Sequence, residues 1–254
     1  MRFFHLLHAA IAAGLMLAGL GSAALAQTED TGDLFAQAMA DSLLVDDDEA
    51  PDRAFEAFGT LCATGLAKAC FNAAVLAHKG FDYAGALGWM RKACDFGKMT
   101  ACYFVAAELT IGETPDEPEA RSLFGKACAQ GVTAACLRFG EMLEYGIGGP
   151  DDARKAFDVY KRACAAPSGV ACDRLATFFS YRDGFDSDDI AKRATLETAC
   201  GLNTWSACSS LAEMLRQGQG GQADEPRATE LFAKVCLDGE VMSQCDVMLL
   251  TLDK

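Results

Sequence analysis

Residues 128–164 read CAQGVTAACLRFGEMLEYGIGGPDDARKAFDVYKRAC, and this stretch contains one unit of a repeat that decides the fold. It opens on two cysteines with seven residues between them and closes on the first cysteine of the next pair. Six cysteine pairs, five with seven residues between the thiols and the last with eight, begin 32, 34, 36, 36 and 36 residues apart along the chain. The six pairs are Cys62/Cys70, Cys94/Cys102, Cys128/Cys136, Cys164/Cys172, Cys200/Cys208 and Cys236/Cys245. This step is the length of a helix–turn–helix unit and predicts a solenoid.

The residues before the first cysteine of each pair have the pattern of an amphipathic helix. In the quoted unit, Ala156, Tyr160 and Ala163 lie eight, four and one residues before Cys164. Apolar residues at this spacing share one helix face. Asp152 lies four residues before Ala156, where its carboxylate can accept hydrogen bonds from the free N–H groups of the first turn. The same position holds Asp82, Asp116, Asp188 and Asp224 in other units.

Glycines mark where the predicted helices stop. Gly131 follows Cys128 by three residues, and glycine or asparagine at that place is typical of a left-handed helix end. After the second cysteine, a further helix is expected, with a small residue such as Gly140 four positions on. It should stop at a glycine ten residues past that cysteine, namely Gly80, Gly112, Gly146 or Gly218. The fourth repeat departs from this pattern, because Arg182 holds the position.

The periodic cysteines predict local disulfides in an oxidising compartment. Each pair should join the end of one repeat to the start of the next, because both thiols then face each other across one short turn. An even number of regularly spaced cysteines in an exported chain is typical of a disulfide framework. A metal site is disfavoured, since His78 is the only histidine after the N-terminal segment and no Cys-x-x-Cys occurs. No cofactor is expected.

The N-terminus predicts export and a three-part organisation. Residues 1–26 have a short basic start, an apolar stretch and an A-x-A ending, so we expect a Sec-type bacterial signal peptide cleaved after Ala26. An uncleaved anchor is the alternative, and after cleavage no membrane anchor is expected. Residues 27–49 should form a capping helix, from Leu34 to Val45, and an acidic loop. Residues 50–254 should form about five full repeats with partial terminal units.

The negative net charge argues against nucleic acid as a partner. The formal net charge is −14 at pH 7, so phosphate backbones would be repelled rather than neutralised. We therefore expect a chain that does not bind nucleic acid. From the signal peptide and the paired cysteines, we expect it to be periplasmic or secreted.

The run from Leu137 to Cys164 resembles the L-G-x-x-Y-x-x-G-x-G-V-x-x-D-x-x-K-A-x-x-x-Y-x-K-A pattern of the Sel-1-like repeat family, which is related to tetratricopeptide repeats. The resemblance covers roughly residues 50–250 and implies an all-α, right-handed α/α solenoid. The cysteine pairs are similar to those of the secreted, cysteine-rich bacterial branch (the Hcp type). That branch has been linked to penicillin binding and weak β-lactamase activity, whereas the wider family consists mostly of adaptors.

Catalytic motifs do not support the enzymatic alternative. A serine β-lactamase needs Ser-x-x-Lys, and no serine here has a lysine three residues later. Ser122 and Lys126 are four apart, and His78 is more simply read as solvent-facing than as a general base. The sequence favours a non-enzymatic scaffold, with a penicillin-binding or β-lactamase-like hydrolase as the alternative.

A binding face remains as the candidate functional site. In tetratricopeptide-like solenoids the first helices line a concave face that binds peptides, and this resemblance implies a groove for a protein or peptide ligand. A cell-wall-related ligand is one option, and a monomer is expected. An ordinary solvated helix face is the competing interpretation. The candidate residues are Asn72, Phe104, Arg138, Glu141, Tyr145, Arg174, Tyr181, Ser210 and Glu213.

Overall fold

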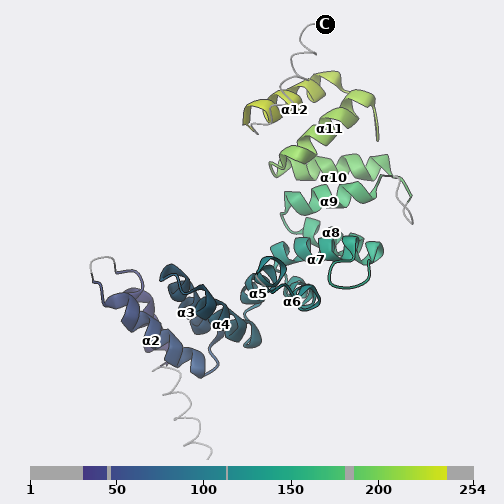
Figure 1. The fold of residues 1–254 in the computed structure, drawn as a ribbon. Coiled ribbons are helices and arrows are strands. Elements are labelled where there is room, and N and C mark those ends of the chain that lie inside the picture. Colours follow the sequence, from purple (N-terminus) through teal and green to yellow (C-terminus); the bar gives the residue numbers. More distant parts are fainter. Residues whose placement is uncertain (1–30, 45–46, 113, 181–185, 239–254) are drawn as a thin grey trace, which may run out of the picture. The chain divides into compact units, whose positions relative to one another are not determined.

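The computed structural model describes residues 31–44, 47–112, 114–180 and 186–238, and all regular structure in these ranges is helical. A helix over residues 31–41 precedes helices α2 to α12, which are labelled in Figure 1. These are α2 (Ala50–Ala63), α3 (Ala67–Lys79), α4 (Tyr83–Asp95), α5 (Met99–Ile111), α6 (Glu117–Ala129), α7 (Thr133–Tyr145), α8 (Ala153–Ala165), α9 (Gly169–Phe178), α10 (Asp189–Gly201), α11 (Trp205–Gln217) and α12 (Glu225–Asp238). The predicted all-α solenoid is confirmed.

The chain divides into two compact units, and the division falls within α5, between Val105 and Ala106. In unit 1, which ends at Val105, α3 packs against both α2 and α4. In unit 2, which begins at Ala106, each helix from α6 to α12 packs against the next, and α9 also touches α11. Odd-numbered helices from α3 to α11 are the first helices of the repeats. Even-numbered helices are the second helices.

The aspartate caps begin the second helices as predicted. Asp152 Oδ1 accepts a hydrogen bond of 2.9 Å from the backbone N–H of Lys155. Each bond of this kind satisfies one of the N–H groups that the first helical turn leaves without a partner. The same contact, to the residue three positions on, is made by Asp82, Asp116, Asp188 and Asp224.

Most helix ends also follow the prediction, but neither Gly80 nor Gly112 has the left-handed conformation. Left-handed backbone is present at Gly65, Gly97, Gly131, Asn203, Gly146 and Gly218. After α3, however, Gly80 has a φ of −79° and Phe81 takes the left-handed φ of 63° instead. The α3–α4 loop has only three residues, and its hydrogen bond from Asp82 N to Ala77 O closes the turn around Phe81. The turn therefore places the positive φ on a residue that has a Cβ.

The first helices begin earlier than the sequence suggested. The pattern places each start at the second cysteine, but the helices start three residues before it, as Ala67 does before Cys70. The carbonyl of Leu66 already accepts a bond of 3.3 Å from the N–H of Cys70. The second cysteine therefore lies within the first helical turn.

Small and large residues alternate in the core at the predicted positions. Alanines eight residues before the first cysteine are buried, as are Phe58, Phe124, Tyr160, Leu196 and Phe232 four residues before it. Gly140 in α7 is the clearest case of close approach. A Cβ there would lie 2.5 Å from Cε1 of Tyr160 in α8, so only glycine fits at this contact.

The helix at the start of the described residues ends earlier than the expected span from Leu34 to Val45. It ends at residue 41, and Leu43 and Leu44 beyond it are 72% and 50% exposed. Ala38 is fully buried in the core of unit 1, and the Phe35 ring lies 5.6 Å from that of Phe58. The expected signal peptide of residues 1–26 and the acidic Asp46 lie outside the described residues.

Candidate functional site: the face of the first helices

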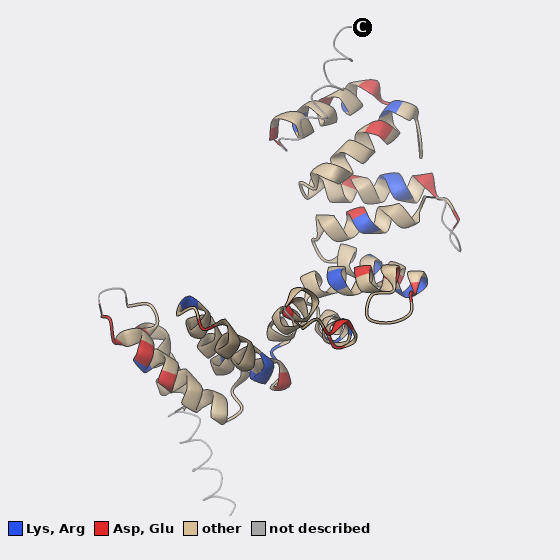
Figure 2. Ribbon diagram, viewed as in Figure 1, with Lys and Arg blue, Asp and Glu red and all other residues tan. Residues whose placement is uncertain are grey.

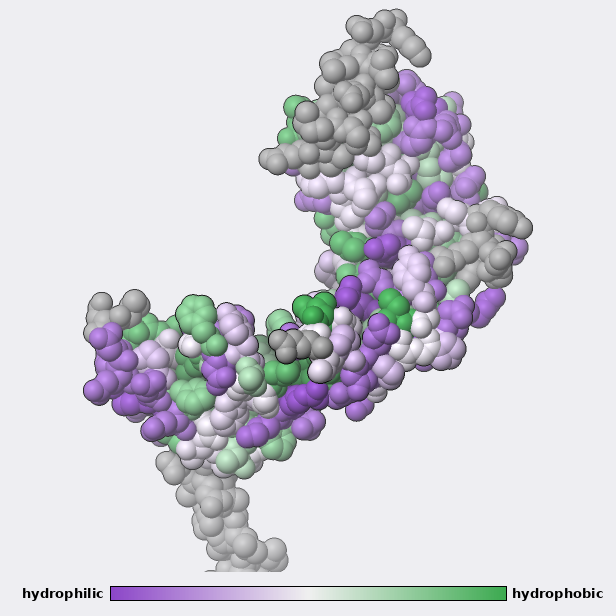
Figure 3. All heavy atoms as spheres, viewed as in Figure 1, coloured by the Kyte–Doolittle hydropathy of each residue, from purple (hydrophilic) through white to green (hydrophobic). Residues whose placement is uncertain are grey.

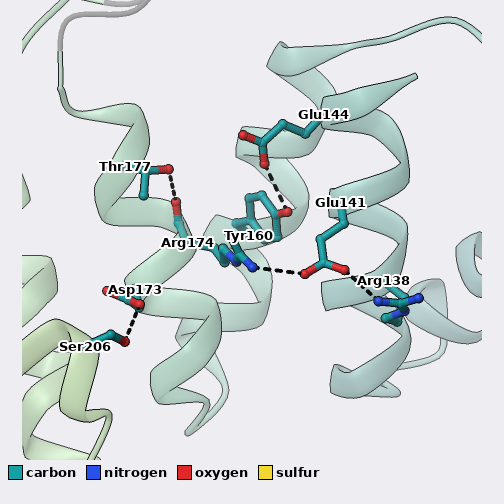
Figure 4. A network of polar contacts seen from close by, with 8 residues as sticks. All are labelled: Arg138, Glu141, Glu144, Tyr160, Asp173, Arg174, Thr177 and Ser206. Carbon is teal, nitrogen blue, oxygen red and sulfur yellow. Dashed lines mark hydrogen bonds and ion pairs between the residues drawn. The ribbon is translucent and has the colours of Figure 1, made fainter. Parts of the chain in front are cut away.

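An ion-pair cluster joins two of the first helices in unit 2. Arg138 and Glu141 lie one turn apart on α7, and Arg138 Nη1 donates a hydrogen bond of 3.0 Å to Glu141 Oε2. Arg174 on α9 donates to the other carboxylate oxygen, Oε1, over 3.3 Å. Figure 4 shows Glu141 between the two guanidinium groups. Three residues that the sequence named separately are therefore brought together by helix packing.

The cluster is partly open to solvent. The side chains of Arg138 and Arg174 are 47% and 42% exposed, and that of Glu141 is 24% exposed. Each guanidinium has five N–H donors and uses one of them in these contacts. The remaining donors can hydrogen-bond to a ligand without breaking the contact to Glu141.

A second polar contact, beside the cluster, joins α7 to α8. Tyr160 Oη donates to Glu144 Oε2 over 3.3 Å, and the two residues are shown in Figure 4. The Tyr160 ring is buried, and this burial raises the pKa of its hydroxyl, with a further contribution from the charge of Glu144. This hydrogen bond therefore joins the first helix of the repeat, α7, to its second helix, α8.

Sequence reasoning missed one residue pair that connects α9 to α11. Ser206 Oγ donates a hydrogen bond of 2.7 Å to Asp173 Oδ2 (Figure 4). Asp173 precedes the predicted Arg174 by one residue, and Ser206 lies two residues before Cys208. Their separation of 33 residues equals that of Glu141 and Arg174, so a search for polar pairs at this offset would have found them.

The other predicted residues of unit 2 do not join the cluster. Tyr145 is 63% exposed at the end of α7, and Ser210 is exposed on α11. Glu213 pairs within its own helix, with Arg216 at 2.6 Å and with Gln217. The hydrogen bond from Arg216 lowers the pKa of Glu213. Tyr181 lies outside the described residues.

The predicted residues of α7, α9 and α11 together are called the first-helix face of unit 2 from here on. They are Arg138, Glu141, Tyr145, Arg174, Ser210 and Glu213.

Unit 1 presents a more apolar surface at the corresponding positions. Phe104 on α5 is 48% exposed, and its ring lies 6.2 Å from that of Phe71 on α3. Asn72 Nδ2 donates to Met39 Sδ over 3.0 Å, which links α3 to the N-terminal helix. Figure 3 shows hydrophobic side chains among hydrophilic ones on the visible face of this unit. The predicted Asn72 and Phe104 are therefore close to apolar neighbours rather than to charges.

The cysteines form structural bridges. The five disulfides in the described residues pair each first cysteine with the second of the same pair: Cys62–Cys70, Cys94–Cys102, Cys128–Cys136, Cys164–Cys172 and Cys200–Cys208. Local pairing is thus confirmed for these five. Cys236 is also disulfide-bonded, and its predicted partner Cys245 lies outside the described residues. Multiple disulfides are typical of an extracytoplasmic protein.

The candidates for catalysis are not assembled into a site. His78 is exposed and packs edge-on against Tyr83, with ring centroids 5.1 Å apart. Ser122 and Lys126 are both exposed on α6. Within the described ranges, no group of three histidine, cysteine or acidic side chains is placed to hold a metal ion. Acidic and basic residues are interspersed along the described helices, as Figure 2 shows.

Across residues 31–238, apart from the gaps given above, no helix combines the length and apolarity needed to cross a bilayer.

Comparisons with known structures agree with this architecture. The protective antigen c5321 of uropathogenic Escherichia coli, which displays an SLR fold, superimposes with a TM-score of 0.74 at 19% identity. The match covers 84% of this chain and 47% of that one, so this chain spans about half of the antigen's length. A Sel1 repeat protein from Oxalobacter formigenes has a TM-score of 0.70 at 20% identity, covering 84% and 86% of the two chains. A comparison with curated proteins found no match.

The family comparison rests on sequence rather than on superposition. The Sel1 repeat model matches residues 67–97, 100–132, 133–168 and 205–239, which together make up more than half of the chain. The unmatched gap between the last two contains the fourth repeat, whose loop departs from the pattern. Proteins built from these repeats generally mediate protein–protein interactions and are generally not enzymes. The protein belongs to the Sel1 repeat family.

Proposed function

We propose that this protein is an exported, non-enzymatic scaffold that binds a peptide or protein partner through the first-helix face of unit 2. The single observation that carries the proposal is the cluster of Arg138, Glu141 and Arg174. It holds two half-exposed guanidinium groups in fixed positions on neighbouring helices. A pre-positioned donor pair loses less conformational entropy on binding than two free side chains do.

The rest of the face supports a peptide ligand. Tyr145 offers an exposed aromatic ring on the helix that carries Arg138 and Glu141, and Ser210 adds a hydroxyl on α11. Aromatic and arginine side chains are enriched among the residues that dominate protein interfaces. The described residues do not bring together a set of side chains that suits small-molecule catalysis. We therefore do not propose the β-lactamase-like alternative.

Export is the second part of the proposal. It is supported by the disulfides and by the signal-like residues 1–26. Edman sequencing of the protein isolated from the periplasm or medium should begin at Gln27. A sequence that begins at Met1 in an intact membrane fraction would contradict cleavage and support an anchor.

Partner binding can be tested by photo-crosslinking in the compartment where the protein resides. A benzophenone amino acid at Tyr145 should give a discrete crosslinked product, whereas the same group at Lys161, exposed on the second helix α8, should not. The product should disappear when Arg138 and Arg174 are both changed to serine. A product that forms equally from both positions, or that survives the double substitution, would show that this face is not the binding site.

A further inference from the structure

The ion-pair cluster of the first-helix face holds two positive charges against one negative charge. In the part of the chain that the structure describes, Glu141 is the only carboxylate that Arg138 and Arg174 contact, and it accepts one hydrogen bond from each. One carboxylate cannot neutralise two guanidinium groups, so one positive charge stays unmatched. The two arginine side chains that carry it are 47% and 42% exposed, and a partner can therefore reach them.

The other carboxylates near the cluster accept hydrogen bonds from hydroxyl groups instead. Glu144 Oε2 accepts from Tyr160 Oη, and Asp173 Oδ2 accepts from Ser206 Oγ, as Figure 4 shows. These two carboxylates leave the remaining arginine donors unused, but their charges and the net charge of −14 limit the attraction of an anion from a distance. An anion at this face must therefore be held by short-range hydrogen bonds.

Each guanidinium of the cluster keeps a pair of parallel N–H groups. A guanidinium has one such fork at Nε and Nη2 and a second at Nη1 and Nη2. Among the described residues, Arg138 uses only Nη1, so its fork at Nε and Nη2 stays open. Arg174 uses one of the two N–H groups on Nη2, so one of its two forks stays open. A fork of this kind matches the two oxygens of a carboxylate.

Arg216 on α11 has the opposite arrangement at a similar exposure of 43%. Its Nε and Nη2 donate to the two oxygens of Glu213 over 3.1 and 2.6 Å. One carboxylate thus matches one guanidinium in both charge and geometry. The cluster lacks this match because two arginines from different helices share one carboxylate. A second carboxylate would complete it.

We propose that the partner of the first-helix face presents a carboxylate group to Arg138 and Arg174. This inference rests on the proposed function and specifies the chemistry of the partner. The carboxylate belongs either to an acidic side chain or to the C-terminus of the partner chain, and both present the same two oxygens. It accepts two parallel N–H groups from an open fork, while Glu141 keeps its own hydrogen bonds.

Sodium acetate, with acetamide as its neutral match, probes the cluster in the full, disulfide-intact protein. At constant ionic strength, acetate should shift the side-chain Nε–Hε NMR resonances of Arg138 and Arg174 in a saturable way. Acetamide should shift them less, because it carries no charge and offers one oxygen. Arg216 is the internal control and should also shift less, because its Nε–H is already bound to Glu213. Equal shifts from acetate and acetamide, or an equal shift of Arg216, would overturn the proposal.

The decisive variant combines Arg138→Lys with Arg174→Lys, which retains both charges and removes both forks. Its affinity for acetate, followed by the backbone amide shifts of α7 and α9, should fall about threefold or more. Arg216→Lys is the matched control and should leave the affinity unchanged. If the double variant binds acetate as tightly as the wild type, charge alone holds the probe and the proposal is wrong.

Three blocked tripeptides identify the source of the carboxylate. Ac-Ala-Glu-Ala-NH2 carries it on a side chain, Ac-Ala-Ala-Ala-OH carries it at the C-terminus, and Ac-Ala-Gln-Ala-NH2 is the neutral match. Tighter binding of the first peptide assigns the group to an acidic side chain, and tighter binding of the second assigns it to a chain terminus. If neither binds more tightly than the neutral peptide, the proposal fails.

Crosslinking from Tyr145 separates this proposal from the proposed function. Loss of the crosslinked product in the lysine double variant supports recognition of a carboxylate by the forks. A product that persists in the lysine variant but disappears when both arginines are changed to serine would keep the binding face and overturn the carboxylate assignment. The absence of any product in the otherwise unchanged protein would overturn the proposed function, and this assignment with it.

Discussion

Glu141 on α7 accepts a hydrogen bond from Arg174 on α9, 33 residues further along the chain. The same separation joins Asp173 to Ser206 and Met39 to Asn72. In unit 2 the cysteine pairs repeat every 36 residues, so the contacting residues are offset by about one helical turn. In unit 2, the polar contacts from α7 to α9 and from α9 to α11 therefore share a shift of one turn, and this shift decides which side chains meet on the face.

Removal of the shared carboxylate should cost little stability but should loosen the arginines. Glu141→Ala is expected to lower the free energy of unfolding by about 0.2–1 kcal/mol, because both ion pairs are partly exposed and screened by water. A double-mutant cycle with Arg174→Ala, followed by urea unfolding, measures the coupling. A coupling energy of zero would mean that the observed pair does not persist in solution.

Gly140→Ala should be strongly destabilising, whereas Gly88→Ala should not. The added methyl at Gly140 would enter the Tyr160 ring and should cost about 1–3 kcal/mol through overpacking. Gly88 lies inside α4 with no atom within 4 Å of its would-be Cβ, so alanine there should stabilise the helix by about 0.5–1 kcal/mol. Thermal unfolding of both variants checks the difference in sign.

Tyr160 should contribute a pH-dependent loss of stability in alkaline solution. Burial raises the pKa of its hydroxyl above the ordinary value of 10.0, so above pH 10 the unfolded chain releases this proton while the folded chain retains it. Its contribution is fully present below pH 10 and falls by about 1.4 kcal/mol per pH unit above it. Urea unfolding between pH 9 and 11 should show a steeper decline for the wild type than for Tyr160→Phe. Parallel curves would contradict this assignment.

Loss of one disulfide should destabilise one repeat junction without changing the pairing of the others. Replacement of Cys164 and Cys172 by serine removes a bridge between residues eight apart. The chain-entropy relation predicts a loss of about 2.5 kcal/mol for a loop of this length. Calorimetric unfolding of the double variant measures the loss, and mass mapping of the remaining disulfides serves as the control.

The sequence identified the repeat, its helices and its bridges because these features depend on local geometry. A cysteine pair across one turn, an aspartate three residues before an N–H group and a glycine at a left-handed helix end all act within one unit. Phe81 is one exception: the local pattern pointed to Gly80, but the three-residue loop places the left-handed conformation one position later.

The contacts that the candidate binding residues make could be learned only from the tertiary structure. The sequence named Arg138, Glu141 and Arg174 from their position on the first helices, but it did not reveal that one carboxylate is shared between two helices. It likewise named Glu213, which the structure pairs within its own helix. Such contacts depend on the shift between neighbouring helices, and that shift follows from side-chain packing rather than from repeat length.

The sequence by itself determined that the chain is a disulfide-stapled array of helix pairs, because caps, helix ends and short-range bridges are encoded within each repeat. Only the tertiary structure decided which side chains of different repeats meet, such as Glu141 with Arg174 and Asp173 with Ser206. The physical reason is distance along the chain. Contacts over 33 residues are set by how helices pack, and no single repeat contains that information.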